Sequence, residues 1–237
     1  MHIGTSGWHY KHWRGPFYTP DLRTSDMLPF YARHFDTVEI NNTFYRLPTP
    51  GTVKSWRDVA PRSFCFAAKG SRYLTHMKKL KDPKPGLAKF FQRIENLGKK
   101  LGPIVFQLPP GWHCNAERLE SFLKALPRKH RYSFELRDPS WHNQTIYALL
   151  RRHNAAFCIY ELAGFQSPEE ITADFTYVRL HGPLGAYQGS YTNELLASWS
   201  RRIRRWRSEL RHIYIYFDND QSGFAVVNAL ELRKMTR

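Results

Sequence analysis

The 237-residue sequence has little of what membrane-spanning and secreted proteins need. No apolar run approaches the roughly 20 residues that cross a bilayer. The start, from Met1 to Trp8, has neither the basic head nor the apolar stretch of a signal peptide and leads directly into a predicted strand. The three cysteines show no paired spacing, which is typical of core thiols in a reducing compartment. We therefore expect a cytoplasmic protein without a membrane partner.

Cofactor and metal motifs are also missing. There is no G-x-G-x-x-G and no P-loop, so we expect no organic cofactor. There is no H-E-x-x-H and no C-x-x-C pair. The side chains that could still ligate a divalent ion have no clear ligand spacing: Glu39, Glu135, His181 and Asp218. The run Asp218–Asp220 resembles an acidic metal loop, but such triplets are common in turns. A metal site is therefore not favoured.

Acidic residues are scarce, with 20 Asp and Glu against 36 Lys and Arg, which gives a net charge of +16. This excess favours nucleic acid, phosphorylated metabolites or acidic lipid as partners. It also serves simply to keep a protein soluble, and the sequence leaves both readings open. The arginine-rich segment 193–210 carries an apolar stripe at helical spacing, so its arginines are expected to face water. The basic run 78–81 supports a polyanionic partner if it adjoins the site.

What the sequence does contain is a set of two-faced strands. In the segment 132–137, Tyr132 and Phe134 share one face, whereas Glu135 and Arg137 share the other. This period of two predicts a strand. Strands are expected near residues 2–6, 36–41, 64–69, 103–107, 131–137, 156–160, 175–181 and 213–218. Helical spacing predicts helices near residues 26–35, 52–60, 85–99, 116–126, 143–153, 193–210 and 222–234, with Asn115 and Thr192 as N-caps. The segment 161–174 reads as irregular.

Eight strands separated by helices predict parallel pairing, because tight hairpins cannot cross such gaps. An open sheet covered on both faces would have to bury Glu135 and Arg137 at a high cost. A closed barrel can instead turn polar at its mouth. The fold class is therefore α/β, a (β/α)8 TIM-type barrel that occupies residues 1–237 as a single domain.

Polar side chains gather where the predicted strands end, and in a parallel barrel these ends meet at one mouth. They are Ser6, Glu39, Asn41, Lys69, Gln107, Glu135, Arg137, Tyr160, Arg179, His181 and Asp218. Burying so many charges is costly unless they are paired. They therefore form either a functional site or a structural ion network that closes the top of the barrel, and we favour the site because perturbed charges cluster at functional positions.

Each side chain in this set has an expected role. Glu135 and His181 are candidate acid–base groups, and Glu39 is a third catalytic candidate that orients substrate hydroxyls together with Asn41. An anion would be held by Lys69, Arg137 and Arg179. Further substrate contacts are expected from Gln107, Trp8, Tyr10, Trp141, Asp218 and Asn219. Two other aromatic residues, Trp13 and Trp112, read as a hydrophobic lid on the barrel.

Several of these segments together resemble the YecE-like family, known as domain of unknown function 72. The resemblance spans the chain in order and is carried by the segments 4–10, 39–45, 64–69, 134–137, 179–182 and 216–220, with Trp13 and Trp141. It implies a TIM-type barrel and a site at its mouth, but it implies no reaction. The family often has two asparagines after the last strand, whereas this chain has Asp218 and Asn219.

The sequence thus predicts an enzyme that acts on an anionic substrate, such as a phosphorylated sugar, a nucleotide or a nucleic-acid end. Hydrolase or lyase chemistry without an organic cofactor fits the missing motifs. An alternative is a non-catalytic barrel that binds RNA or DNA through the arginine-rich helix and the lysine run. A third reading is a scaffold whose ancestral site no longer turns over. The oligomeric state is left open.

Overall fold

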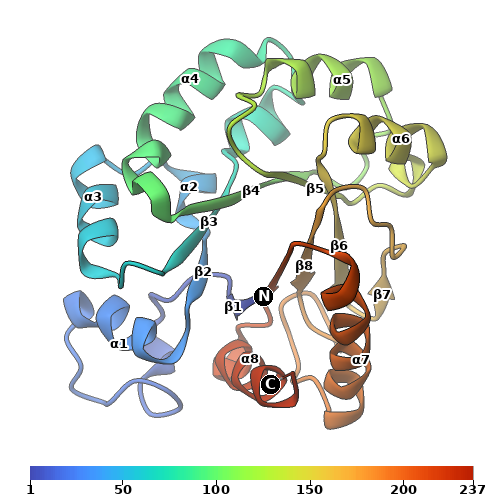
Figure 1. Ribbon diagram of the computed structural model, residues 1–237. Coiled ribbons are helices and arrows are strands. Elements are labelled where there is room, and N and C mark those ends of the chain that lie inside the picture. Colours follow the sequence, from blue (N-terminus) through green and yellow to red (C-terminus); the bar gives the residue numbers. More distant parts are fainter. Residues whose placement is uncertain (237) are drawn as a thin grey trace.

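The computed structural model describes residues 1–236 and confirms the barrel (Figure 1). Eight parallel strands form a nearly closed ring in the order β1, β9, β8, β6, β5, β4, β3, β2. Their bounds are β1 (His2–Thr5), β2 (Thr37–Ile40), β3 (Cys65–Lys69), β4 (Leu101–Leu108), β5 (Tyr132–Leu136), β6 (Ala156–Leu162), β8 (Phe175–Leu180) and β9 (His212–Phe217). Every strand expected from the sequence is present.

Helices surround this ring and connect consecutive strands (Figure 1). They are α1 (Met27–His34), α2 (Asn42–Tyr45), α3 (Pro50–Val59), α4 (Pro83–Ile94), α5 (Ala116–Ala125), α6 (Gln144–Arg152), α7 (Asn193–Glu209) and α8 (Phe224–Met235). The predicted N-caps are confirmed, because the Asn115 side chain accepts a hydrogen bond from the Arg118 amide and Thr192 accepts one from Leu195. None of the helices among the described residues is long and apolar enough to cross a membrane.

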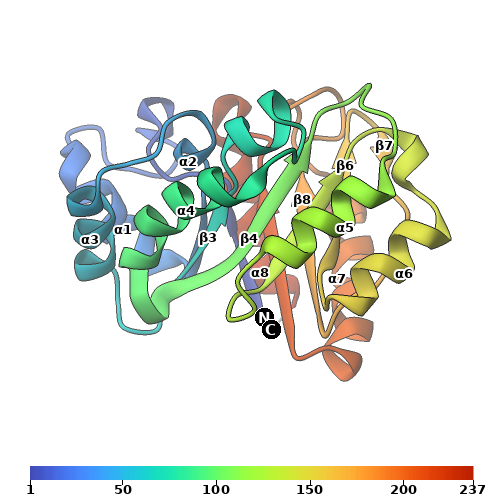
Figure 2. The same cartoon turned by 90° about the horizontal axis from the view of Figure 1, so that it is seen from above.

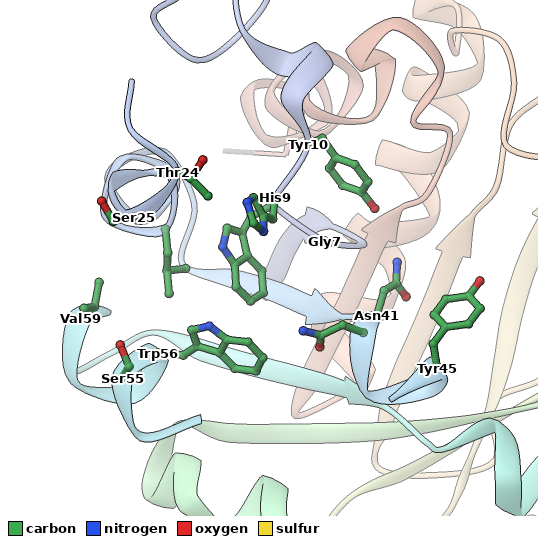
Figure 3. Close-up of a pocket in the computed structure, with 13 residues that line it drawn as sticks. Gly7, His9, Tyr10, Thr24, Ser25, Asn41, Tyr45, Ser55, Trp56 and Val59 are labelled. Carbon is green, nitrogen blue, oxygen red and sulfur yellow. The ribbon is translucent and has the colours of Figure 1, made fainter. Parts of the chain in front are cut away.

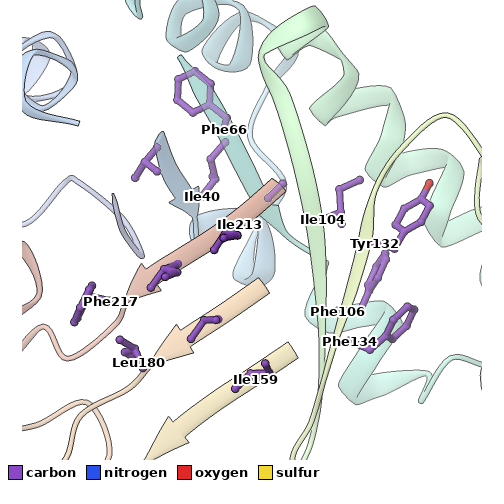
Figure 4. Packing of buried hydrophobic residues seen from close by; sticks show 14 of the residues in the cluster. Ile40, Phe66, Ile104, Phe106, Tyr132, Phe134, Ile159, Leu180, Ile213 and Phe217 are labelled. Carbon is purple, nitrogen blue, oxygen red and sulfur yellow. The ribbon is translucent and has the colours of Figure 1, made fainter. Parts of the chain in front are cut away.

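The two faces of each strand pack as their alternation predicts. Outward residues meet the helices, and Figure 4 shows Phe106, Tyr132 and Phe134 side by side in this outer layer. Inward residues fill the lower barrel with a second apolar cluster that includes Val105, Cys158, Tyr177, Tyr214 and Tyr216. The inner face becomes polar only above this cluster. The barrel is therefore a packed core with a polar mouth.

The seam between β1 and β2 closes the ring over a short length. A parallel bridge joins Ser6 to Glu39, and the Gly7 amide donates to the Glu39 carbonyl at 2.8 Å. Gly4 lies where the two strands approach most closely, because a Cβ added there would be 2.4 Å from the Thr37 carbonyl oxygen. The first two strands thus meet through few backbone contacts and one charged residue.

Two segments differ from the sequence-based expectation. The segment 161–174 contains β7 (Phe165–Gln166), which pairs antiparallel with β6. Ala163 and Gly164 both have positive φ, which suits a two-residue hairpin turn that irregular composition does not reveal. The predicted helix 85–99 ends as α4 at Ile94 and continues as the 3₁₀ segment η4 (Glu95–Lys100), within which Gly98 leaves the helical conformation.

The eight strands of the ring point the same way, so the loops that follow them gather at one end of the barrel (Figure 2). Among these loops are the 3₁₀ turns η1 (Lys11–Trp13), η5 (Pro139–Trp141) and η6 (Gln221–Gly223), and a π-helical turn, η3 (Tyr73–Met77). A further 3₁₀ turn, η2 (Thr24–Asp26), leads into α1. On α7 the apolar stripe is buried against the barrel and most of the arginines are exposed, as predicted.

Candidate functional site

The mouth is organised around the Arg179 guanidinium, which is 0% exposed. Its Nε and Nη2 atoms donate to the two oxygens of Glu39 at 3.0 and 2.7 Å. Its Nη1 donates to Glu135 Oε2 at 2.7 Å, and Nη2 also reaches Asp218 Oδ2 at 3.1 Å and Ser6 Oγ at 3.2 Å. One side chain from β8 therefore links groups at the ends of β1, β2, β5 and β9.

Two carboxylates of this network, Glu135 and Asp218, stay ionised because the neighbouring cations outweigh the effect of burial. Burial alone would raise the pKa of Glu135, but Arg137, Arg179 and His181 together hold it well below its ordinary value. The pKa of Asp218 is likewise lowered, since Arg179, His181 and Lys69 outweigh its desolvation. Three carboxylates, those of Glu39, Glu135 and Asp218, pair with Arg179, and Glu135 also pairs with Arg137. Pairing of this kind is what allows such a cluster to exist in a buried position.

His181 connects two carboxylates in a continuous chain. Its Nδ1 lies 3.0 Å from Asp218 Oδ2, and its Nε2 lies 3.2 Å from Glu135 Oε1. The ring is buried beneath Tyr187, which contacts it edge-on at 5.5 Å. A proton can therefore pass along Asp218, His181 and Glu135 without crossing open water.

Glu39 is fully used by protein partners. Besides Arg179 it accepts hydrogen bonds from the Tyr177 hydroxyl at 2.5 Å and from Ser6 Oγ. It is completely buried, and it sits at the seam that closes the barrel. Its geometry is that of a structural anchor beneath the mouth, rather than of the hydroxyl-orienting group that the sequence suggested.

Four polar side chains reach the surface of the mouth. The side chains of Arg137 and Asp218 are 11% and 10% exposed, and Lys69 and Gln107 are 7% and 4% exposed. Arg137 donates from Nε to Glu135 Oε1 at 2.6 Å, while its Nη atoms contact the Tyr187 hydroxyl at 3.3 and 3.4 Å. Lys69, Gln107 and Arg137 come from the adjacent strands β3, β4 and the end of β5. They form a row of hydrogen-bond donors along one side of the mouth.

A pocket of about 510 Å³ lies beside this mouth, between the ends of β1 and β2 and the helix α3 (Figure 3). Its walls are aromatic, with Trp8 packed edge-on against Trp56 at 5.3 Å and with Tyr10 between the pocket and the ion network. The Tyr10 hydroxyl donates to the Ser6 carbonyl at 2.8 Å. Asn41 projects into the pocket, and its buried Oδ1 has no hydrogen-bond partner within residues 1–236. The pocket offers aromatic faces and one free amide oxygen.

Three predicted ligand contacts lie away from any open surface. Arg179 is enclosed by its carboxylates, so the expected grip on a substrate anion does not match its position. Trp141 is buried and donates from Nε1 to the Trp112 carbonyl at 2.6 Å. Asn219 is buried and donates to the Gly189 carbonyl and to Asn228, which ties down the loop after β8. These three side chains shape the mouth from behind.

Sequence reasoning missed three side chains at the mouth. His76 lies on η3 and meets the Phe44 ring edge-on at 5.1 Å. Tyr187 covers His181, and Trp56 forms a wall of the pocket. The positions of His76 and Tyr187 carried a signal, because each follows a predicted strand and therefore belongs to the same mouth.

The four potential metal ligands, Glu39, Glu135, His181 and Asp218, lie around the Arg179 guanidinium. Among the described residues there is no group of three or more His, Cys, Asp or Glu side chains placed to hold a metal ion. The Arg179 guanidinium occupies the space between the carboxylates of Glu39, Glu135 and Asp218, where a cation would have to sit.

The lowered carboxyl pKa values predict that the folded protein loses stability in acid. A carboxyl whose pKa is lower in the folded state stabilises the fold above its unfolded pKa, which is 4.5 for Glu135 and 3.8 for Asp218, and this contribution is lost as pH falls further. We expect the free energy of unfolding in urea to fall steeply below about pH 4. The variant Glu135→Gln should show a shallower fall, and an unchanged slope would contradict the assignment.

Comparisons with known proteins place this geometry in a family. A family model described as "Protein of unknown function DUF72" matches residues 2–237. The UPF0759 protein YecE of Escherichia coli is 30% identical over 142 residues, which are 60% of this chain and 50% of that protein. The match therefore spans about half the length of YecE. The UPF0759 protein YunF of Bacillus subtilis is 22% identical over 99% of this chain and 94% of its own length.

Solved structures agree with the fold. A DUF72 family protein from Thermotoga maritima has a TM-score of 0.89 and 27% identity, covering 99% of this chain and 98% of its own. A DUF72 family protein from Enterococcus faecalis has a TM-score of 0.83 and 18% identity, covering 99% and 94%. The barrel is thus the architecture that these proteins share.

Proposed function

Because the chain belongs to the DUF72 family of proteins of unknown function, the site itself has to indicate the chemistry, and we propose that the protein is an enzyme acting on an anionic substrate at the barrel mouth. The reaction would be a hydrolase or lyase step driven by acid–base chemistry. The substrate class includes phosphorylated sugars and nucleotides, whose phosphate carries the negative charge that the mouth is built to accept.

One observation supports this proposal above all. The donor row of Lys69, Gln107 and Arg137 faces the mouth and has hydrogen-bond donors available for a ligand. Arg137 uses Nε on Glu135, but both Nη atoms have only Tyr187 and the His181 ring as neighbours in the hydrogen-bonded network. Guanidinium groups bind phosphate and carboxylate in a bidentate manner. Desolvated cations at a concave mouth favour an anion more than exposed ones do.

Acid–base chemistry would use the chain Asp218, His181 and Glu135. Asp218 is the member that faces the mouth, whereas Glu135 lies deepest. A proton taken from the substrate side at Asp218 or His181 could pass inward to Glu135 and return later in the cycle. Arg179 and Glu39 would hold this chain in position without contacting the substrate. The residue roles follow from accessibility and hydrogen bonding.

The adjoining pocket would take the uncharged part of the substrate. Trp8, Trp56 and Tyr10 provide aromatic faces for a planar ring or for the apolar face of a sugar. The free Oδ1 of Asn41 would accept a hydrogen bond from an amino or hydroxyl group. An anion at the donor row and a ring in the pocket together describe a sugar phosphate or a nucleotide.

A thermal-shift screen over inorganic phosphate, sugar phosphates, nucleotides and divalent ions tests the proposal. We expect phosphate compounds to raise the melting temperature. Arg137→Gln should weaken phosphate binding about 10- to 100-fold, because one charge-assisted hydrogen-bonded contact contributes about 1.5–3 kcal/mol. The matched control Arg201→Gln, on the exposed face of α7, should bind like the wild type. Equal binding by both variants would remove the donor row from the proposal.

A second candidate function is non-catalytic binding of single-stranded nucleic acid. It is favoured by the lysine run 78–81, which belongs to the loop after β3 and therefore adjoins the mouth, next to the exposed ring of Tyr73. The arginine-rich helix contributes less, since Arg202 and Arg205 are paired with Glu169. A steep salt dependence of oligonucleotide binding, without turnover, would favour this function over the enzyme.

A further inference from the structure

We propose that Lys69 is a nucleophile that forms an imine with a carbonyl group of the substrate, and that His76 moves the protons of this step. The inference rests on the proposed function, since the carbonyl compound would be the anionic substrate of the same mouth. It adds a covalent step and a substrate class, a phosphorylated aldehyde or ketone, to that function.

The Lys69 amine lies free of carboxylates inside the mouth. The residue ends β3 on the inner face of the barrel, and it is 7% exposed. In the part of the chain that the structure describes, no carboxylate oxygen lies within 4.0 Å of Nζ. Its Nζ sits instead over the Phe44 ring, 4.4 Å from the centroid. Its backbone is fixed by Thr43, whose hydroxyl donates to the Lys69 carbonyl at 2.6 Å.

The surroundings make this amine easy to deprotonate. Burial, and then the charge of Arg179, lower the pKa of Lys69 to about 8, with Asp218, Glu135 and Glu39 opposing the shift. A lysine that is desolvated or placed beside another cation is the form in which lysines act as nucleophiles. About a tenth of such an amine is in the free-base form at pH 7, against well under a thousandth for an ordinary lysine.

His76 lies against the same aromatic ring as Lys69. Its imidazole meets the edge of Phe44 with centroids 5.1 Å apart and an interplanar angle of 83°. Thr75 Oγ1 lies 2.9 Å from its Nδ1, which leaves Nε2 available. Burial, and then the charges of Lys69, Arg72 and Arg137, lower the pKa of His76 to about 4, with Glu135 opposing. The ring is therefore neutral near pH 7, the form that can relay a proton from one atom of an adduct to another.

The loop that carries His76 has a costly backbone. Residues Tyr73–Met77 form a π-helical turn, a rare conformation that is frequent at functional sites. Three residues soon after it, Lys79, Leu80 and Asp82, have φ angles of 44°, 64° and 43° although none is glycine. Such conformations cost of order 1–3 kcal/mol each and cluster at active sites. The strain thus accompanies the placement of a histidine beside the strand-end lysine.

The step balances without any further reactant. Lys69 reacts as the free amine, its proton having passed to water. The amine lone pair attacks the carbonyl carbon, a C–N bond forms, and His76 relays a proton from nitrogen to oxygen to give a carbinolamine. A proton from water then lets the hydroxyl group leave as water while the protonated imine forms. This imine can withdraw electrons from a neighbouring C–C or C–H bond, and water later releases the product and restores the amine.

Reductive trapping tests the inference directly. The protein is treated at pH 7 with pyridoxal 5′-phosphate and sodium borohydride, and the modified lysines are identified by peptide mass spectrometry. We expect Lys69 to be labelled on the order of 100-fold faster than the exposed Lys54, in proportion to its free-base fraction. Inorganic phosphate should slow this labelling, and pyridoxal without its phosphate should label Lys69 more slowly.

Two variants separate the roles. Lys69→Met should abolish the adduct while the melting temperature shows that the fold is kept. His76→Gln should slow labelling of Lys69 at least 10-fold and leave the phosphate-induced thermal shift unchanged. Labelling of Lys69 at the rate of Lys54, with phosphate still bound, would overturn the imine and leave the proposed function standing. Rapid labelling that neither phosphate nor the probe's phosphate group affects would instead support the amine and remove the anion site.

Discussion

Replacing Arg179 by methionine is expected to lower the free energy of unfolding by about 3–5 kcal/mol. The substitution keeps a long side chain but removes the positive charge that lies against Glu39, Glu135 and Asp218. These carboxylates have little access to water, so they would have to remain ionised without their partner or take up protons. Equilibrium urea unfolding measures the effect, and the midpoint should recover partly at low pH, where the carboxyls become protonated.

The controls for this variant decide between charge and packing. Arg201→Met removes an arginine from the exposed side of α7 and should change stability by less than about 0.5 kcal/mol. The double variant Arg179→Met with Glu135→Gln should be less destabilised than the sum of its parts, because the two residues are in contact. A loss below about 1 kcal/mol in Arg179→Met would mean that the network stabilises the fold no more than an exposed ion pair does.

Replacing Glu135 by glutamine is expected to reduce turnover about 10²- to 10⁴-fold, the usual contribution of a positioned acid–base group. Arg137 and Arg179 donate to different oxygens of Glu135, so the single oxygen of glutamine keeps only one of these hydrogen bonds, and the amide cannot receive a proton from His181. The expected stability loss is about 1–3 kcal/mol, which a folded chain of this size can bear. The assay uses whichever phosphorylated compound the thermal-shift screen identifies.

Phosphate binding provides the internal control for Glu135→Gln. Removing a negative charge that lies 2.6 Å from Arg137 Nε should leave phosphate affinity unchanged or improve it. Loss of turnover with retained binding would separate chemistry from recognition. If the variant fails to fold at neutral pH, the network is a structural closure of the barrel top. If it folds and turns over normally, Glu135 has no part in proton transfer.

The sequence predicts the barrel well because strand alternation is a local property. The segment 132–137 shows which residues face inward before anything else is known, and five other segments show the same alternation. The strand-end position of Glu39, Glu135, Arg179 and His181 follows from that rule alone, and the structure brings these four together. Their chemical roles stay predictions.

Pairing inside the mouth could not be predicted from the sequence. Which carboxylates a given arginine contacts depends on the stagger of strands across the barrel, and that is a long-range property. Arg179 is predicted, like Arg137, to hold a substrate anion because arginine binds such groups in a bidentate manner, yet Arg179 is enclosed and Arg137 reaches the surface. The path of the loop with His76 could not be predicted either. Lys79, Leu80 and Asp82 adopt left-handed conformations, which a sequence normally indicates by glycine.

At the seam between β1 and β2, one residue takes part both in closing the barrel and in the ion network. Glu39 is at once the residue through which β2 meets Ser6 and the carboxylate that Arg179 grips most fully. A charged group that enters the mouth and attracts or repels Arg179 therefore also changes the forces on Glu39. Its effect reaches the seam between β1 and β2, where the barrel closes. Local opening of the barrel would then begin at the seam between β1 and β2, and a ligand bound at the mouth would make this opening rarer.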